Sequence, residues 1–262
     1  QRTNNRRRTT QMKITFLGTS SGVPTAERNV SNIDMMLDNG SVYMFDCGEG
    51  TQHQLQKSII KSGKITTIFI THMHGDHVFG MPGLLCTLSG NNPPTRTHID
   101  IYGPLGLAQY LRTSLRLSDS HLGFTIAVHE IVPEETTEDQ LPQVLESELL
   151  PSEKRGSYIV YDKEQSCYHI VKQDGVTVRA APILHRVFTV GYVVEEDSSP
   201  GKLDMDLATK LGVPKGPLLG KLKNGQDITL TNGTVIKSTD VIGPEQKGRK
   251  AVILGDTHDP SG

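Results

Sequence analysis

The stretch FITHMHGDHVFG, residues 69–80, is the most informative segment of the sequence because it packs three histidines and an aspartate behind an apolar, β-branched run. A buried strand holds its residues rigidly, and the loop at its end can turn several side chains toward one point. His72 and His74 can face the same way, while Asp76 and His77 can turn toward a neighbouring point. Imidazole and carboxylate groups are ligands that zinc prefers, so this spacing predicts a metal centre at the end of a strand.

The chemistry of such a centre depends on how many positions the protein leaves open. A catalytic zinc site keeps one position for water, and two cations roughly 3.5–4 Å apart provide a nucleophile near neutral pH. A solvated histidine-rich loop and a purely structural zinc site are the two alternatives. Further ligands must come from elsewhere, and His185 and Asp256 each follow a strand-like run. Alone, each is ordinarily a surface or turn residue, and only the HxHxDH spacing makes them candidate ligands.

Length and composition indicate a folded domain rather than a tail. The 262 residues, 35% of them hydrophobic and with a formal net charge of −2, can form one large core or two small ones. The three cysteines lack paired spacing, which favours free thiols in a reducing compartment. No window of about 18 apolar residues appears, and no apolar run follows the N-terminal arginines. We therefore expect neither a membrane segment nor a secretory signal.

Short apolar runs separated by turns dominate the rest of the chain. Strand-like runs lie at 12–18, 41–46, 66–71, 98–103, 124–131, 176–183, 188–194 and 250–256. Segments 50–63 and 103–117 carry apolar residues at helical spacing. Many strands with a few helices predict sheets covered by helices, a layered α/β or α+β body. We interpret the acidic, turn-rich stretch 133–175 as a surface insertion that carries a hairpin.

Several long motifs, in order, resemble those of the ribonuclease Z family within the metallo-β-lactamase superfamily. HMHGDH (72–77) is similar to the metal signature of the superfamily. The motifs similar to the narrower family, which trims the 3′ end of precursor tRNA, are FLGTSSGVPT (16–25), FDCGEGTQHQL (45–55), FGMPGLLCTLSG (79–90) and IYGPLGL (101–107). The similarity runs from Met12 to the last residues and is weakest in 133–175.

The resemblance implies a fold and a set of ligands. The fold is a metallo-β-lactamase-like four-layer αβ/βα sandwich over 12–262, lacking its C-terminal part in this chain, behind a basic, disordered segment 1–11. The complete protein would hold two zinc ions per subunit, although manganese or iron also suits histidine and aspartate ligands. The implied ligands are His72, His74 and His185 for the first zinc, Asp76 and His77 for the second, and Asp256 as the bridge.

The resemblance also implies an activity, the removal of the 3′ trailer from precursor tRNA by phosphodiester hydrolysis, which leaves a 3′-hydroxyl on the tRNA. Asp76 is the expected catalytic residue, because a carboxylate within hydrogen-bond reach of the attacking water can take its proton. The small residues of GTSSGVPT (18–25) are expected to line the cleft. Asp46 and Glu49 are expected to organise the loop beneath the site rather than to bind metal. The lysine-bearing segment 201–225 resembles the flexible arm with which the family grips tRNA.

Partners and location follow from the same resemblance, which implies a homodimer that acts on precursor tRNA in the cytoplasm, the nucleus or both. Two further histidines of the family pattern have no match in this chain. We therefore expect the parent protein to be active and leave open whether this chain is active alone. Two alternatives remain: another phosphodiesterase of the same fold, which would not need the arm, and an inactive, truncated RNA-binding or dimerisation module.

Overall fold

The computed structural model describes residues 12–90, 97–198 and 201–259. Segment 1–11, which the sequence predicts to be disordered, lies outside the described residues. The chain forms two compact units: the first comprises Gln1–Asp174, Val178–Val193 and Val252–Gly262, and the second Gly175–Thr177 and Val194–Ala251. Within the described ranges, no helix has the length and apolar character needed to cross a membrane.

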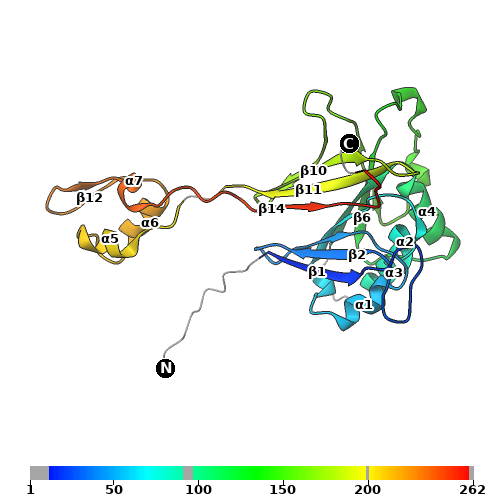
Figure 1. Cartoon of the computed structure of the whole chain (residues 1–262), viewed down its shortest axis with the longest axis horizontal. Helices are drawn as coiled ribbons and strands as arrows, with labels where there is room; N and C mark the ends of the chain where they lie inside the picture. The colour runs from blue at the N-terminus through cyan, green and yellow to red at the C-terminus, as the bar shows by residue number, and fades with distance from the viewer. Residues whose placement is uncertain (1–11, 91–96, 199–200, 260–262) are drawn as a thin grey trace. The chain divides into compact units, whose positions relative to one another are not determined.

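An eight-stranded sheet forms the centre of the first unit (Figure 1). Its strands are β1 Lys13–Gly18, β2 Asn32–Met36, β3 Val42–Phe45, β4 Ile65–Phe69, β5 His98–Pro104, β6 Thr125–Ile131, β7 Glu153–Lys154 and β8 Tyr158–Ile159. The order is β1-β2-β3-β4-β5-β6-β7, with β8 also paired to β6. Strands β1 to β3 are antiparallel, and β3 to β8 pair in parallel. The loops that follow β3 and β4 therefore leave the sheet at the same edge, where ligands of α/β sheets usually bind.

Helices cover one face of this sheet (Figure 1). They are α1 Thr51–Lys57, α3 Met81–Gly90 and α4 Leu107–Leu117, and the short 3₁₀ turn η1 Ser62–Lys64 leads into β4. The predicted helix in 50–63 ends at Lys57, because Ser58 is extended and its backbone N–H caps the carbonyl of Leu55. The strands and helices share one apolar core in which Ile68, Leu84 and Leu111 are buried. Burial of such side chains contributes about 1.5–3 kcal/mol each.

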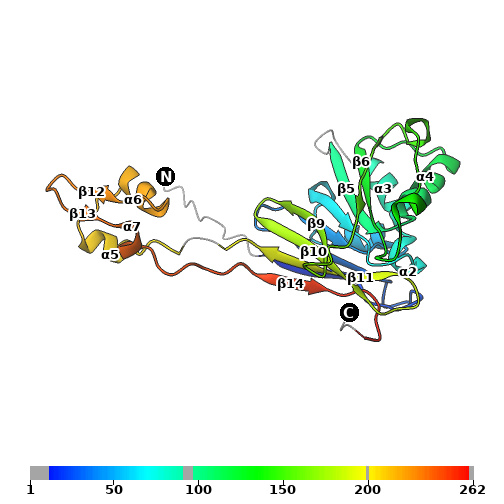
Figure 2. The same cartoon turned by 90° about the horizontal axis from the view of Figure 1, so that it is seen from above.

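A second, four-stranded sheet packs on the other face (Figure 2). Its strands are β9 Tyr168–Gln173, β10 Val176–Ile183, β11 Thr189–Glu196 and β14 Lys250–Ile253, in the order β14-β11-β10-β9. The ring of Tyr192 lies 5.2 Å from the ring of Phe69, and its hydroxyl donates to the carbonyl of Ile70 at 2.7 Å. Helices, large sheet and small sheet thus form three successive layers. The predicted α/β fold class is confirmed, and these layers are the helix–sheet–sheet part of the four-layer sandwich.

The hairpin predicted within 133–175 is reduced to a single antiparallel bridge, in which Asp162 and Cys167 exchange two backbone hydrogen bonds. In β8, Tyr158 pairs in parallel with Glu130 of β6, whereas β9 joins β10 in the small sheet. Between β8 and β9 only an isolated bridge joins Asp162 to Cys167. The outer edge of β6 carries backbone groups that need partners, so most of the pairing of β7 and β8 is with the large sheet rather than within the segment. Two 3₁₀ turns, η2 Glu138–Gln140 and η3 Glu146–Glu148, also occur in this segment.

The second unit has a small core of its own. Its elements are α5 Met205–Lys210, α6 Pro217–Lys223, β12 Ile228–Thr229, β13 Val235–Ile236 and α7 Ser238–Val241. The side chains buried among them are Ala208, Val213, Leu222, Ile228, Ile236 and Val241. Asp204 caps α5, because its carboxylate accepts hydrogen bonds from the N–H groups of Asp206 and Leu207. The segment 201–225 expected to form an arm is therefore one part of a longer folded unit.

Candidate metal centre

The candidate ligands come from three places in the first unit. Thr71 and His72 follow β4 after Ile70 and are fully buried, and the short helix α2 Gly75–Val78 comes next. His185 follows the end of β10, and Asp256 follows the end of β14. Strand ends from both sheets thus bring side chains that are far apart in the sequence to one place.

Three imidazole nitrogens form the first group. The Nε2 atom of His72 lies 3.0 Å from Nδ1 of His74, and Nε2 of His185 lies 3.2 Å from the same Nδ1 atom. The rings of His72 and His185 are 5.1 Å apart. Such a trio can hold one metal ion, because each histidine offers a nitrogen within 4.8 Å of the others.

A second group of three donors shares His72 with the first and adds His77 and Asp256. The Nε2 atom of His77 lies 3.5 Å from Oδ1 of Asp256 and also 3.5 Å from Oδ2 of Asp76. Asp76 therefore borders this group through His77. All six residues singled out in the sequence lie in this one cluster.

Hydrogen bonds fix which nitrogen of two buried rings is free. His77 donates from Nδ1 to Oδ2 of Asp46 at 2.7 Å, so its Nε2 atom faces Asp76 and Asp256 with a lone pair. His72 donates from Nδ1 to the hydroxyl of Thr71 at 3.0 Å, which leaves its Nε2 atom free in the same way. Such outer partners orient metal-binding histidines and set their tautomer.

Asp46 holds this arrangement together beneath the site. Its Oδ1 atom accepts hydrogen bonds from the N–H and the hydroxyl of Thr71, at 2.8 and 3.0 Å. Its backbone is left-handed, with φ of 59°, a conformation that is unfavourable for a residue other than glycine and clusters at functional sites. Glu49, which was expected to lie beneath the site or in a turn, lies in an exposed turn.

The charge states of His72 and Asp76 suit metal binding, whereas for His77 burial is outweighed by the hydrogen bond to Asp46 and the charges of the nearby carboxylates, which raise its pKa. Burial, followed by the charges of His77 and His74, lowers the pKa of His72 to about 3, so its ring is neutral at physiological pH. Burial alone would raise the pKa of Asp76, but the N–H of Gly22 and the charge of His77 outweigh it and lower this pKa. Metal ligands must be unprotonated, and a set of several imidazoles with carboxylates fits zinc better than calcium or magnesium.

Two glycines allow the loop after β3 to touch α2. The N–H of Cys47 donates to the carbonyl of His77 at 2.7 Å, and the N–H of Gly80 donates to the carbonyl of Cys47 at 2.9 Å. A Cβ atom on Gly80 would lie 2.0 Å from the carbonyl oxygen of Gly48. A Cβ atom on Gly48 would lie 2.3 Å from the carbonyl oxygen of Asp76, so Gly48 and Gly80 are both needed for close backbone approach.

The GTSSGVPT loop was expected to line the cleft, and within it the N–H of Gly22 donates to Oδ2 of Asp76 at 2.7 Å. Two other residues of the site were not singled out in the sequence. Thr71 was not singled out, although it directly precedes His72. Arg186, next to His185, was also missed, and its Nε atom donates to Nε2 of His74 at 3.0 Å. Adjacency to a candidate ligand is the only sequence signal that marks these two residues.

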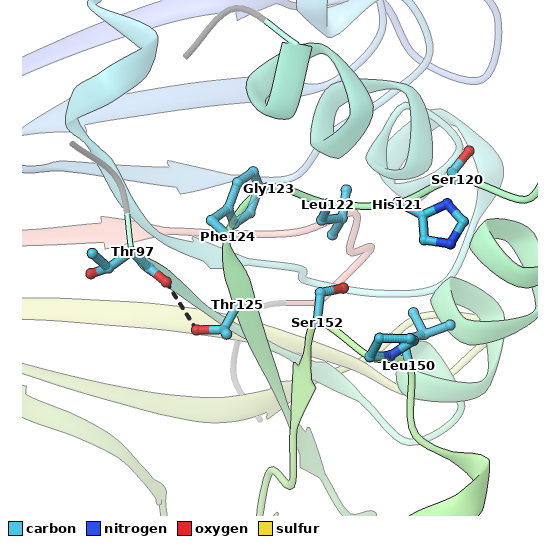
Figure 3. A pocket seen from close by; sticks show the side chains of 10 residues that line it. Thr97, Ser120, His121, Leu122, Gly123, Phe124, Thr125, Leu150 and Ser152 are labelled. Carbon is cyan, nitrogen blue, oxygen red and sulfur yellow. Dashed lines mark hydrogen bonds between the residues drawn. The ribbon is translucent and has the colours of Figure 1, made fainter. Parts of the chain in front are cut away.

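A cavity of about 570 Å³ lies away from this cluster (Figure 3). It lies where β5 and β6 begin, and there the hydroxyl of Thr125 donates to the carbonyl of Thr97 at 2.9 Å. The cluster of candidate metal ligands lies instead beyond the end of the parallel strand β4. The lining residues are Thr97, Ser120, His121, Leu122, Gly123, Phe124, Thr125, Leu150, Pro151 and Ser152, and His121 is the only one of them with an ionisable side chain of the kind that binds zinc. Chemistry therefore favours the histidine cluster as the functional site.

Comparisons with known proteins fit this geometry. The chain is 44% identical over 255 residues to zinc phosphodiesterase ELAC protein 1 of Bos taurus, covering 94% of this chain and 69% of that protein. It is 43% identical over 249 residues to a ribonuclease Z of Acaryochloris marina, covering 94% of this chain and 67% of that protein. A family model described as Anti-Pycsar protein Apyc1 matches residues 12–124.

A solved structure of a related protein is similar in fold. The crystal structure of human tRNase Z, short form (ELAC1), superposes with a TM-score of 0.59 at 41% sequence identity. The match covers 70% of this chain and 63% of that chain, so this sequence spans somewhat less than two thirds of its length.

Proposed function

Because the chain belongs to the ribonuclease Z family, we propose that it is a zinc-dependent endonuclease that removes the 3′ trailer from precursor tRNA. One observation carries the proposal: His72, His74 and His185, from two distant segments, turn three nitrogens toward one point. The donor set of His77, Asp76 and Asp256 lies directly beside it.

The proposed ligand assignment is the one that the resemblance implies. His72, His74 and His185 would hold one zinc ion, Asp76 and His77 would hold a second, and Asp256 would serve both. When bound, zinc lowers the pKa of water to near neutrality and stabilises negative charge on phosphoryl oxygens. Asp46 and Thr71 keep the rings of His77 and His72 in the tautomers that this assignment requires.

Asp76 is the proposed general base. Its lowered pKa keeps the carboxylate ionised, and the N–H of Gly22 fixes one of its oxygens. The carboxylate orients the attacking water and takes its proton as the new bond to phosphorus forms. The bond from phosphorus to the 3′ oxygen breaks, and this oxygen takes up a proton from solvent, which leaves a 3′-hydroxyl on the tRNA and a 5′-phosphate on the trailer.

The second unit supplies positive charge for the RNA. Its lysines Lys202, Lys210, Lys215, Lys221 and Lys223 are all exposed. None of them forms an ion pair with any other residue that the structure describes. Free lysines of this kind bind phosphate through counterion release, so tRNA binding should weaken as salt concentration rises. The proposal also includes a homodimer that works in the cytoplasm or nucleus, and light scattering at working concentration tests the dimer.

The direct test compares zinc-loaded wild type with Asp76→Ala on a labelled precursor tRNA. We expect the wild type to release an intact trailer with a 5′-phosphate, and Asp76→Ala to be slower by at least about 10²-fold, the usual contribution of a general base. Equal cleavage by both proteins would contradict the assigned base. A wild-type protein that holds zinc and leaves the precursor intact would contradict the proposed activity itself.

A small-molecule phosphodiesterase is the second candidate, because the relative of Bos taurus is named a zinc phosphodiesterase, a name that does not restrict the substrate to RNA. Replacing Lys215, Lys221 and Lys223 with alanine separates the two functions. Deleting residues 214–219 instead is a poorer choice, because Leu218 and Leu219 pack against the core of the second unit. Loss of tRNA cleavage with unchanged hydrolysis of a nitrophenyl phosphodiester supports the endonuclease. Hydrolysis of the nitrophenyl phosphodiester by a wild-type protein that leaves precursor tRNA intact would favour the small-molecule enzyme.

A further inference from the structure

Arg186 lies beside the candidate metal ligands, and among the described residues no carboxylate pairs with it. Its side chain is exposed, and its Nε atom donates to Nε2 of His74 at 3.0 Å. Within residues 12–90, 97–198 and 201–259 this is the only hydrogen bond of the Arg186 side chain, and no carboxylate pairs with it. A guanidinium group has five N–H donors, so most of them are available to another ligand.

The contact between Arg186 and His74 is not compatible with a filled metal site. His74 points its Nδ1 atom at His72 and His185, so Nδ1 is the nitrogen that faces the candidate metal position. A neutral histidine that binds a cation through Nδ1 carries its proton on Nε2. That N–H group would then face the Nε–H of Arg186, and two donors cannot share a hydrogen bond. The guanidinium group must therefore leave His74 when the site is filled.

His72 and His77 differ from His74 in this respect. Each of them donates its outer N–H to an oxygen acceptor, Thr71 for His72 and Asp46 for His77. These two hydrogen bonds can form with or without a bound metal, whereas the hydrogen bond from Arg186 to His74 can form only without it. Arg186 is therefore not an outer partner that orients a ligand.

We propose that Arg186 binds the phosphate that is cut. This inference rests on the proposed function, since it requires a phosphodiester at the metal centre. The planar guanidinium group donates two parallel hydrogen bonds to a phosphate, and charge-assisted bonds of this kind are among the strongest in proteins. Arg186 adjoins His185 in sequence and contacts His74, so a short movement of a flexible side chain brings its donors to a phosphate held between the two groups of ligands.

The test measures RNA binding separately from cleavage. The ligand is a precursor tRNA in which a methylene group replaces the bridging 3′ oxygen at the cut, so the phosphorus keeps its charge and the bond cannot be hydrolysed. We expect Arg186→Ala to retain zinc and to bind this RNA about tenfold more weakly, with the slope of log K against log salt smaller by about one. Arg186→Lys should restore part of the affinity, because it keeps the charge but not the planar pair of donors.

A second RNA isolates the phosphate in question. With a neutral methylphosphonate at the cut, wild type and Arg186→Ala should bind equally. Lys64→Ala is the matched surface control, because Lys64 is an exposed cation that precedes β4 and lies at the far edge of the sheet. It should change the affinity for the charged RNA by less than about twofold.

Three results would overturn the inference. The first is unchanged affinity of Arg186→Ala for the charged RNA, and the second is an equal loss of affinity for the neutral RNA. The third is a loss of zinc with normal RNA binding, which would make Arg186 a support for His74. A zinc-loaded wild type that neither binds nor cuts precursor tRNA would instead refute the proposed function, and the inference with it.

Discussion

At the scale of single residues, Asp46 has a strained, left-handed backbone and orients the ring of the candidate ligand His77. Its left-handed conformation is held by hydrogen bonds to Thr71 and His77, and these bonds fix the free nitrogen of His77. We expect Asp46→Ala to weaken zinc binding about 10–100-fold, the usual effect of losing an outer partner of a ligating histidine. Competition with a chelator of known affinity measures the change. The nearby exposed Glu49→Gln is the control, and equal affinities for both variants would contradict this role of Asp46.

Asp34 is a second residue whose environment leads to a prediction. It is fully buried in β2, and neither carboxylate oxygen has a hydrogen-bond partner among the described residues. Burial raises its pKa from 3.8 to about 7. The folded state therefore favours the protonated form, and this stability is present below pH 3.8 and is lost as pH rises through about 7.

The stability that Asp34 loses as pH rises corresponds to about 4 kcal/mol of unfolding free energy, because a tenfold change in an acid dissociation constant is equivalent to about 1.4 kcal/mol. Asp34→Asn removes the titration and keeps the side-chain shape. Urea denaturation of both proteins without metal, at pH 4 and pH 8, compares them. We expect the variant to be favoured over the wild type by several kcal/mol more at pH 8 than at pH 4. A stability difference that is the same at both pH values would show that Asp34 does not titrate in this way.

The residues of the candidate site differ in how far sequence could identify them. His72, His74, Asp76 and His77 share a spacing typical of metal sites, so their chemistry was predictable from the chain alone. Arg186 carries no such pattern, because its contact with His74 depends on two loops that meet only in the folded chain.

At the scale of elements, the site depends on close contact between the loop after β3 and helix α2. A Cβ atom on Gly80 would lie 2.0 Å from the carbonyl oxygen of Gly48, and backbone cannot yield as a flexible side chain does. We expect Gly80→Ala to lower stability by about 1–3 kcal/mol, as overpacking does, and to weaken zinc binding by moving His77. Thermal melts and chelator competition measure the two effects.

Gly90 provides the matched control, because it ends α3 in open space and a Cβ atom added there would have no other atom within 4 Å. Gly90→Ala should therefore leave both stability and zinc affinity within experimental error of the wild type, or raise stability slightly through helix propensity. If Gly80→Ala behaved like Gly90→Ala, the close approach of the two backbones would not matter to the site.

Strand prediction succeeded where runs of apolar residues were long and failed where pairing partners decided the structure. The runs that became β4, β5 and β10 were recognisable because they are apolar, β-branched and bounded by turns. The short strand β2 contains Asn32 and Asp34, polar residues that are rare in strands, so it lacks this signal. The pairing of β8 with β6 could not be predicted either, because it depends on an unpaired sheet edge that only the assembled fold creates.

At the scale of the whole molecule, the chain contains two cores that can be perturbed separately. Leu222 is fully buried in the small core of the second unit. We expect Leu222→Ala to destabilise that unit by about 2–5 kcal/mol. Hydrogen exchange should accelerate in residues 201–251 and stay unchanged in β4 and β5. Leu211→Ala, at a side chain that is 42% exposed, is the control and should have little effect.

The Leu222→Ala variant also separates RNA binding from phosphodiester hydrolysis. If the second unit serves only to grip RNA, Leu222→Ala should raise the apparent KM for precursor tRNA and leave hydrolysis of a small phosphodiester unchanged. Equal loss of protection in β4 and β5, or loss of hydrolysis of the small substrate, would mean that the two cores are coupled.

The proposed enzyme depends above all on zinc binding by donors that converge from distant segments. Anomalous diffraction at the zinc absorption edge, on crystals grown with zinc, locates the bound ions. We expect a strong peak about 2.0–2.1 Å from Nε2 of His72, Nδ1 of His74 and Nε2 of His185, and a second peak beside Nε2 of His77 and Asp76. Zinc bound elsewhere, or a bare histidine cluster in crystals that contain zinc at other positions, would refute this assignment.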